Sequence, residues 1–152
     1  MIKIHPMYKF SSNKDFSEQL VKKINANCVG MDYSISYDAD LTEILPNSSI
    51  LITEYSIVAV EAAFNKIPVI IANIDRQKDD EYSLSYINEG IALYSNTIEQ
   101  LCNAIEKILH DEKTRQRLQE SIDKFNFDYN YLHDGNAAKR ICDLLTRPTR
   151  KR

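Results

Sequence analysis

Residues 50–74 read ILITEYSIVAVEAAFNKIPVIIANI, and this stretch decides the fold. An apolar strand is followed by a polar turn, an amphipathic helix and a second apolar strand. Ser56 falls where the helix should begin, and Glu61 follows later in the same helix. A helix N-terminus carries unpaired N–H groups and a partial positive charge, which suit a phosphate. Because a carboxylate farther along could reach ribose hydroxyls, the stretch indicates a nucleotide-diphosphate ligand.

The rest of the chain repeats this alternation of short apolar strands and amphipathic helices. We expect strands at residues 2–5, 27–31, 49–53, 69–72 and 91–94. We expect helices at residues 14–25, 40–45, 55–65 and 98–109, and two more that begin near Asp111 and Asn136. Apolar strands alternating with helices predict an α/β fold: a Rossmann-like, doubly wound parallel sheet with helices on both faces.

Ligands of such sheets bind beyond the carboxyl ends of the strands. His5, Asn73 and residues 53–56 all lie at predicted strand ends, so they can converge although they are distant in sequence. Asn96 and Glu99 form a capping-box pattern before the helix at 98–109. Helical spacing predicts that these side chains of the last two helices face inward: Leu118, Ile122, Phe125, Ala138, Ile141, Leu144 and Leu145.

Composition narrows the class of protein. The chain has 152 residues, enough for one domain with a full core, and 43% are hydrophobic. A net charge of −3 argues against nucleic-acid binding. No apolar run approaches the roughly 18 residues of a membrane-spanning helix, and no signal peptide opens the sequence. The three scattered cysteines indicate reduced, mostly buried thiols of a cytoplasmic protein, and the three dispersed histidines argue against a zinc site.

Several segments in a fixed order carry a family resemblance. They are Ile4-His5-Pro6, residues 38–45 leading into residues 50–56, Glu61-Ala-Ala, Lys66-Ile-Pro-Val-Ile and Glu89-Gly-Ile-Ala-Leu, followed by paired terminal helices. From about residue 2 to residue 146 the chain resembles the C-terminal half of GT-B-type glycosyltransferases. It is similar to CDP-glycerol glycerophosphotransferases and to bacterial capsule or surface-polysaccharide transferases. The non-hydrolysing UDP-N-acetylglucosamine 2-epimerases share the layout.

The resemblance implies that residues 1–146 form the donor-nucleotide-binding half of a two-domain enzyme, and we expect its N-terminal acceptor domain to be missing here. In the family, the serine after the strand contacts donor phosphates and the glutamate of the next helix binds ribose; these match Ser56 and Glu61. The histidine before proline, here His5, lies near the phosphate or leaving group and is the predicted catalytic residue. The predicted nucleotide contacts are Ser56, Glu61, Thr53, Tyr55 and Lys9. We expect a CDP- or UDP-linked donor as the substrate, and we expect neither a metal nor a cofactor.

The turn after residue 53 departs from both family patterns. The glycerophosphotransferases have aspartate, tyrosine and two serines in a row, whereas Glu54 and Ile57 replace the aspartate and the second serine here. Without the second serine hydroxyl, the turn has one fewer side chain that could donate a hydrogen bond to a phosphate. The epimerases have a glycine pair where Ser56 and Ile57 stand, so the backbone approaches a pyrophosphate less closely here.

Each predicted site residue also has a purely structural interpretation. Ser56 favours a helix N-cap in any protein. Glu61 lies on a helix that we expect to be largely buried, where a carboxylate needs a partner, either ribose or a structural lysine or amide. His5 could stabilise its loop, Tyr55 could pack, and Lys9 could be an ordinary surface lysine.

The predicted function is transfer of a glycosyl or glycerophosphate group from a nucleotide donor to a cell-surface polysaccharide or teichoic-acid-like acceptor. We expect this chain to be part of such an enzyme and to be inactive alone. The alternatives are an epimerase-like domain and a non-catalytic nucleotide-binding module. Residues 147–152 form a basic tail that we expect to be disordered. Its cations predict either a solvated terminus or a peripheral contact with the inner face of the plasma membrane.

Overall fold

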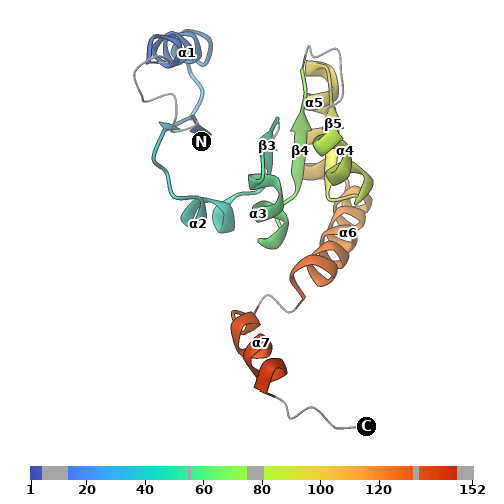
Figure 1. The fold of residues 1–152 in the computed structure, drawn as a ribbon. Helices are drawn as coiled ribbons and strands as arrows, with labels where there is room; N and C mark the ends of the chain where they lie inside the picture. Colours follow the sequence, from blue (N-terminus) through green and yellow to red (C-terminus); the bar gives the residue numbers. More distant parts are fainter. Residues whose placement is uncertain (5–13, 55, 75–80, 132–133, 147–152) are drawn as a thin grey trace. The chain divides into compact units, whose positions relative to one another are not determined.

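The computed structural model describes residues 1–4, 14–54, 56–74, 81–131 and 134–146 (Figure 1). The chain divides into two compact units, Met1–Ile44 and Leu45–Arg152. All strand pairs are parallel among the described residues, in one sheet of two strands and one of three. The predicted α/β class with parallel strands is therefore confirmed.

The first unit pairs two short strands. Strand β1 (Ile2–Lys3) lies parallel to β2 (Ile35–Ser36), and α1 (Lys14–Asn27) lies between them in the sequence. The ladder continues past β1, because Ile4 N–H donates to the Ser36 carbonyl at 2.9 Å. Helix α2 (Leu41–Ile44) follows, and the Asp40 carboxylate accepts the Thr42 N–H at 2.8 Å at its start.

The predicted strand at residues 27–31 is wrong. Helix α1 continues to Asn27, and the strand that pairs with β1 comes later, in a segment where we expected neither a strand nor a helix. Gly30 has φ +80°, a left-handed conformation that interrupts any extended run. Val29 and Met31 are exposed, so their apolar side chains gain no burial there.

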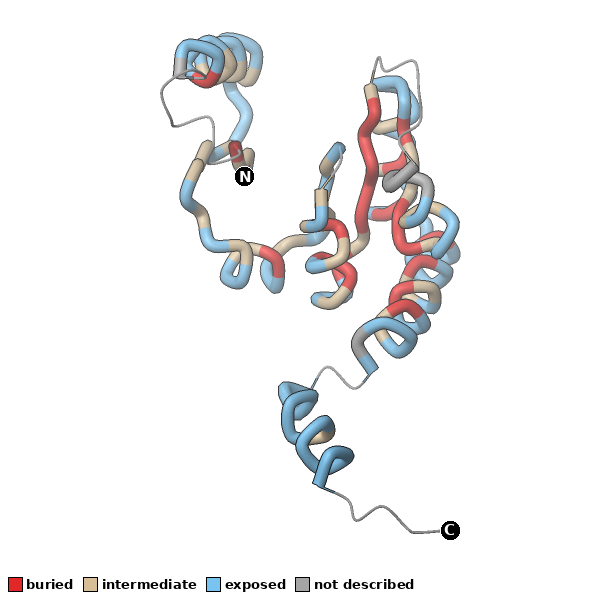
Figure 2. The backbone as a smooth tube through the Cα atoms, in the orientation of Figure 1, coloured by how far each residue is buried: buried red, intermediate tan, exposed pale blue. Residues whose placement is uncertain are grey.

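The second unit holds the larger sheet. Its elements in chain order are the 3₁₀ helix η3 (Leu45–Asn47), β3 (Leu51–Thr53), α3 (Val58–Phe64), β4 (Val69–Ala72), α4 (Glu81–Asn88), β5 (Ala92–Ser95), α5 (Ile98–His110), α6 (Glu112–Asn130) and α7 (Ala137–Thr146). The strand order is β3-β4-β5, with Leu51 opposite Val69 and Val69 opposite Ala92. All four residues of the central strand β4 are buried, as its unbroken apolar sequence predicts (Figure 2).

Helices cover both faces of this sheet. One buried cluster joins Ala63 of α3, Ile91, and Ile122 and Phe125 of α6, with Tyr86 of α4 packed against it. The other cluster contains Ile70, Ala104, Ile108 and Leu118. Helix α6 contributes to both clusters, and its predicted inward residues are buried. The sheet of the second unit is thus doubly wound, as predicted.

The start of α5 corrects the predicted capping box by one residue. Thr97 is the N-cap, and its hydroxyl accepts the Gln100 N–H at 3.2 Å. The Gln100 side chain returns to accept the Asn96 N–H at 2.9 Å. Thr97-x-x-Gln100 thus replaces Asn96-x-x-Glu99, and the return bond goes to the residue before the N-cap and not to the N-cap itself.

Two predictions about burial are wrong. The four residues of α7 that we expected to face inward, Ala138, Ile141, Leu144 and Leu145, are all exposed. Cys102 and Cys142 are exposed and Cys28 is half-buried, although all three are free thiols. Helical spacing identifies an apolar face, but it does not say what covers that face.

Candidate functional site

The turn between β3 and α3 carries the predicted phosphate contact. The Ser56 hydroxyl accepts the Val58 N–H at 3.2 Å, and the Ser56 carbonyl accepts the Ala59 N–H at 3.1 Å. Ile57, not Ser56, is the N-cap, and its carbonyl accepts the Val60 N–H at 2.9 Å. Ser56 therefore stabilises the start of α3 from one residue before the cap.

This arrangement changes the chemistry that the turn can offer. The N–H groups of residues 58–61 all have acceptors within the turn, so the expectation of unpaired donors at these positions is wrong. The cause is local, because the serine side chain and the backbone fold back onto the first turn of the helix. A hydroxyl can accept and donate at once, so the Ser56 O–H still has a proton to offer a ligand oxygen. Its contact with a phosphate stays a prediction.

Glu61 lies on the exposed side of α3. The buried side of this helix consists of Ala59, Ala62 and Ala63, so the expectation that Glu61 is buried is wrong. Among the described residues its carboxylate has no hydrogen bond or ion pair, and it is accessible to an external hydroxyl group. Burial no longer argues for a partner, and ribose binding by Glu61 stays a prediction.

Polar residues end all three strands of the larger sheet. Thr53 closes β3 opposite Ile71 of β4, and Asn73 directly follows β4. Asn73 N–H donates to the Ser95 carbonyl at 2.8 Å, and its side-chain amide donates to the Tyr94 hydroxyl at 3.3 Å. These contacts join the carboxyl ends of β4 and β5, which is the edge where ligands of such sheets bind.

Ser95 belongs to this edge, although sequence reasoning missed it. Its hydroxyl is fully buried and has no hydrogen-bond partner among the described residues. The available signal was its place at the end of an apolar run, directly before Asn96, the capping residue that the sequence predicted. The remaining predicted residues, His5, Lys9 and Tyr55, lie outside the described part of the chain.

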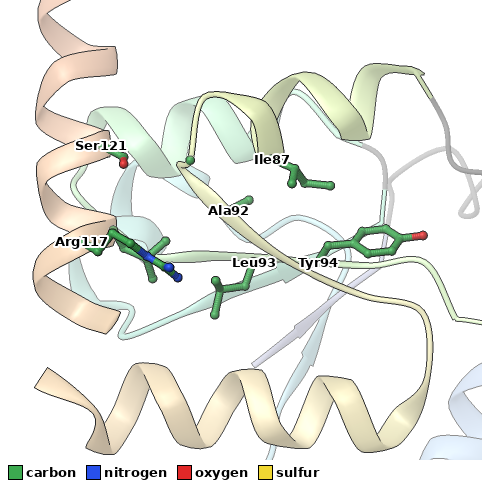
Figure 3. A pocket seen from close by; sticks show the side chains of 8 residues that line it. Ile87, Ala92, Leu93, Tyr94, Arg117 and Ser121 are labelled. Carbon is green, nitrogen blue, oxygen red and sulfur yellow. The ribbon is translucent and has the colours of Figure 1, made fainter. Parts of the chain in front are cut away.

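Two adjoining cavities lie along β5, with volumes of about 360 and 430 Å³. They share Leu93, Tyr94 and Arg117, and Figure 3 shows these side chains around the first cavity. Neither cavity is lined by Thr53, by Ser56 or by Glu61. Among the described residues, the cavities therefore share none of the predicted nucleotide contacts, although Tyr94, which accepts from Asn73 at the carboxyl edge, lines both of them.

Two further features concern metals and membranes. Within the described residues there is no group of three or more His, Cys, Asp or Glu side chains placed to hold a metal ion. None of the described helices is both long enough and apolar enough to cross a bilayer.

Comparison with known proteins supports the fold. A crystal structure titled as the glycotransferase of kitacinnamycin matches with a TM-score of 0.53 and 16% identity, covering 97% of this chain and 41% of that one. This similarity shows a Rossmann-like α/β fold and does not by itself show an activity.

Sequence comparison gives a family. The chain is 23% identical over 145 residues to the teichoic acid glycerol-phosphate primase of Bacillus spizizenii, an alignment that covers 95% of this chain and 33% of that protein. The chain thus spans about a third of the length of this curated relative. A family described as CDP-Glycerol:Poly(glycerophosphate) glycerophosphotransferase matches residues 1–147. Because this match extends over nearly all of the sequence, the chain belongs to the CDP-glycerol:poly(glycerophosphate) glycerophosphotransferase family.

Proposed function

We propose that this chain is the donor-nucleotide-binding part of a GT-B-type transferase that moves glycerophosphate from CDP-glycerol to a teichoic-acid-like polymer. The family match over residues 1–147 carries the proposal, and the name of the Bacillus relative, a glycerol-phosphate primase, supports it. The chain aligns with 33% of that relative, so other parts of such an enzyme would supply the acceptor side. The chain alone would then bind the donor without transferring it.

The proposed site uses the carboxyl edge of the sheet. The Ser56 hydroxyl donates to a donor phosphate, and the exposed Glu61 carboxylate accepts the ribose hydroxyls. His5, whose ordinary pKa is near neutrality, stabilises the leaving phosphate as a cation or as an acid. Thr53, Tyr55 and Lys9 complete the nucleotide contacts. In this proposal the reaction depends on positioning and charge stabilisation by these side chains.

A ligand titration of the chain tests the proposal. The panel is CDP, UDP, GDP and CMP, with cytidine and uridine as controls, and the measurement is the thermal unfolding midpoint. A ligand that binds the folded state alone adds about 2.7 kcal/mol of stability at a hundredfold excess over its Kd. We expect CDP to raise the midpoint more than UDP or CMP does, because the diphosphate engages Ser56 and the base sets the preference.

Site variants make this test specific. Removing a hydrogen bond to a charged group costs about 1.5–3 kcal/mol, so Ser56→Ala and Glu61→Ala should each weaken CDP binding roughly tenfold or more. Ser56→Ala also removes the bond to Val58 N–H, so the readout is the shift that CDP causes in each variant and not the midpoint itself. Glu99→Ala, which removes an exposed helical glutamate elsewhere, is the matched control and should bind as the parent does.

Other outcomes would support other functions. A preference for UDP would favour the epimerase-like alternative, and binding of bare nucleosides as tightly as diphosphates would favour a nucleotide-binding module. No binding at millimolar concentrations, in this chain and in a full-length family enzyme that carries it, would contradict the donor-site proposal. Equal CDP binding by the parent and by Glu61→Ala would remove Glu61 from the site.

We also propose that the protein contacts an anionic membrane surface through α7. Ile141, Leu144 and Leu145 expose apolar side chains on this helix, and Lys139 is exposed beside them. Four more cations, Arg147, Arg150, Lys151 and Arg152, follow in the sequence. An apolar face flanked by cations is typical of helices that lie in a lipid interface, where each basic residue contributes about 1 kcal/mol near an anionic surface.

Vesicle co-sedimentation tests this contact. We expect binding to phosphatidylglycerol vesicles that weakens as salt rises, and little binding to phosphatidylcholine vesicles. The double variant Leu144→Ser, Leu145→Ser should lose most of the binding. Leu109→Ser, at an exposed leucine of α5, should not. Equal binding to both lipids, or by the double variant, would contradict the proposal.

A further inference from the structure

Helices α5 and α6 each present a row of polar side chains to the two cavities. Each row has the spacing i, i+3 and i+7, so its three side chains lie on one face of their helix. The rows are Gln100, Asn103 and Lys107 of α5, and Thr114, Arg117 and Ser121 of α6. Because the two cavities share Leu93, Tyr94 and Arg117, we treat them together as the α5–α6 groove.

The α5–α6 groove offers mostly hydrogen-bond donors. Lys107 and Arg117 can only donate, and the side-chain amides of Gln100 and Asn103 supply further N–H groups. The Gln100 amide oxygen already accepts the Asn96 N–H at 2.9 Å, which leaves its own N–H groups for a ligand. The side chains of Asn103, Lys107 and Arg117 have no hydrogen bond or ion pair with any other described residue. Figure 3 shows Arg117 directed from α6 toward β5.

Among the described residues that line the groove, Asp111 has the only carboxylate. It is already engaged at the start of α6, where it accepts the Thr114 hydroxyl at 2.6 Å and the Lys113 N–H at 3.1 Å. Lys107 and Arg117 together outnumber it. The lining is therefore positively charged and poor in free acceptors, although the whole chain has a net charge of −3.

The groove extends along both β5 and α5. Its first cavity, of about 360 Å³, reaches Gly90 before the strand, and its second, of about 430 Å³, follows α5 from Gln100 to Asp111. Tyr94 lines both cavities, and its hydroxyl accepts the Asn73 amide at the carboxyl edge of the sheet. An elongated ligand in the groove would therefore reach toward the edge where the donor site is proposed.

We propose that the α5–α6 groove binds the polyol-phosphate polymer that the transferase extends, at repeats behind its growing end. This inference rests on the proposed function. Phosphodiester oxygens accept hydrogen bonds from Arg117, Lys107 and the Asn103 amide, and the carbon atoms of the polyol lie against Leu93 and Ile87. The donor-binding part of the enzyme thereby also holds the acceptor chain, while other parts position the reacting hydroxyl.

Hydrogen-bonding chemistry favours this ligand over three others. An acidic peptide brings an N–H donor at almost every residue, and the groove has few acceptors to meet them. A nucleic acid needs aromatic faces on which its bases stack, and Tyr94 is the one aromatic side chain among the described residues of the lining. A single inorganic phosphate would leave most of the groove empty.

Fluorescence anisotropy with the whole chain tests the proposal. The probe is a short fluorescein-labelled oligomer of glycerol phosphate, and the competitors are the unlabelled oligomer, glycerol 3-phosphate, inorganic phosphate and a glutamate oligomer of equal charge. We expect the unlabelled oligomer to displace the probe and the other three to do so only at much higher concentration. Binding should weaken as salt rises, because the contacts are between charges.

Variants locate the oligomer on the groove. Arg117→Gln and Lys107→Gln should each weaken binding about fivefold, the scale of one partly exposed charge pair. Lys22→Gln, which removes an exposed cation of α1 in the first unit, is the matched control and should bind as the parent does. Circular dichroism confirms that each variant is folded.

The basic tail needs its own control, because a polyanion is attracted to any cluster of cations. In the tail variant, four residues are changed together to glutamine: Arg147, Arg150, Lys151 and Arg152. We expect this variant to retain most of the binding, and Arg117→Gln to weaken it by the same factor in the tail variant as in the parent chain.

The CDP titration on the same variants separates this inference from the proposed function. Arg117→Gln should keep the stability shift that CDP causes, because the groove shares none of the predicted nucleotide contacts among the described residues. CDP binding without oligomer binding would overturn the groove proposal alone. Oligomer binding that depends on Arg117, without CDP binding, would support the groove as a polyol-phosphate site and contradict the donor site.

Three further results would overturn the proposal. Equal binding by the parent and by the double variant Lys107→Gln, Arg117→Gln would place the oligomer elsewhere. Loss of binding in the tail variant would assign the oligomer to residues 147–152. Equal displacement by the glutamate oligomer would show attraction between charges without recognition of a polyol phosphate.

Discussion

Replacing Gly90 with alanine should destabilise the second unit through two separable effects. Gly90 joins α4 to β5 with φ +73°, and its N–H donates to the Ile87 carbonyl at 2.9 Å. A Cβ atom at this position would lie 2.8 Å from Ser121 Oγ and 3.2 Å from Ser121 Cβ. The substitution therefore strains the backbone and also forces α6 or its serine to move.

The magnitude follows from these two terms. A left-handed conformation costs a residue other than glycine about 1–2 kcal/mol. Relieving the contact with Ser121 costs roughly 1–2 kcal/mol more, through an unfavourable rotamer or a shift of α6. A total of about 2–4 kcal/mol lowers the unfolding midpoint of a chain of this size by roughly 6–12 °C.

Urea unfolding of matched variants separates the two terms. Gly135 has φ +71° with no atom within 4 Å of an added Cβ, so Gly135→Ala reports strain without a clash and should cost about 1 kcal/mol or a little more. In a Ser121→Ala background the 2.8 Å contact is absent, so Gly90→Ala should cost about 1 kcal/mol less there than in the parent chain. The reasoning is refuted if Gly90→Ala is as mild as Gly135→Ala and Ser121→Ala rescues nothing.

Three further predictions concern stability. Thr97→Ala removes the side-chain cap of α5 and should lower the free energy of unfolding, measured in urea, by about 1 kcal/mol. A change near zero would show that the cap is dispensable. Ile122→Ala leaves a cavity at a fully buried site and should lower the free energy of unfolding by about 2–5 kcal/mol. Ile122→Val should lower it by about 0.5–1.5 kcal/mol. Similar losses for the two variants would contradict the close packing of α6. The Arg140 guanidinium lowers the pKa of Asp134 to about 2, so this ion pair stabilises the α7 connection above pH about 4 and is lost as pH falls toward 2. An NMR titration should return the Asp134 pKa toward its ordinary value in Arg140→Gln, and an unchanged value would exclude the pair as the cause.

Local pattern was enough to predict much of the second unit. The predicted strand at 69–72 coincides with β4, and the predicted inward residues Leu118, Ile122 and Phe125 of α6 are buried. Asp111 was also correctly placed at the start of α6. These features depend on the spacing of apolar residues and on side-chain oxygens that bond to nearby N–H groups, and both are properties of neighbours in sequence.

The candidate site was less predictable. Sequence reasoning selected Ser56, Glu61 and Thr53, but it expected a buried Glu61 and unpaired helix N–H groups that the structure does not contain. It missed Ser95, because only the packed structure shows that this hydroxyl is fully buried and has no hydrogen-bond partner among the described residues. Which hydroxyls are buried and which N–H groups are satisfied depends on contacts between distant residues.

By itself, then, the sequence determined the alternation of strands and helices, the apolar face of each helix and the family to which the chain belongs. The tertiary structure decided which of those faces are covered: α6 buries its face in two clusters, whereas the periodic apolar face of α7 is exposed. It also decided that β2 and not residues 27–31 pairs with β1, and that the described strands of the second unit take the order β3-β4-β5. The physical reason is that periodicity depends only on residues close together in sequence. Burial and strand pairing require contacts between distant segments, and these form only when the chain has folded.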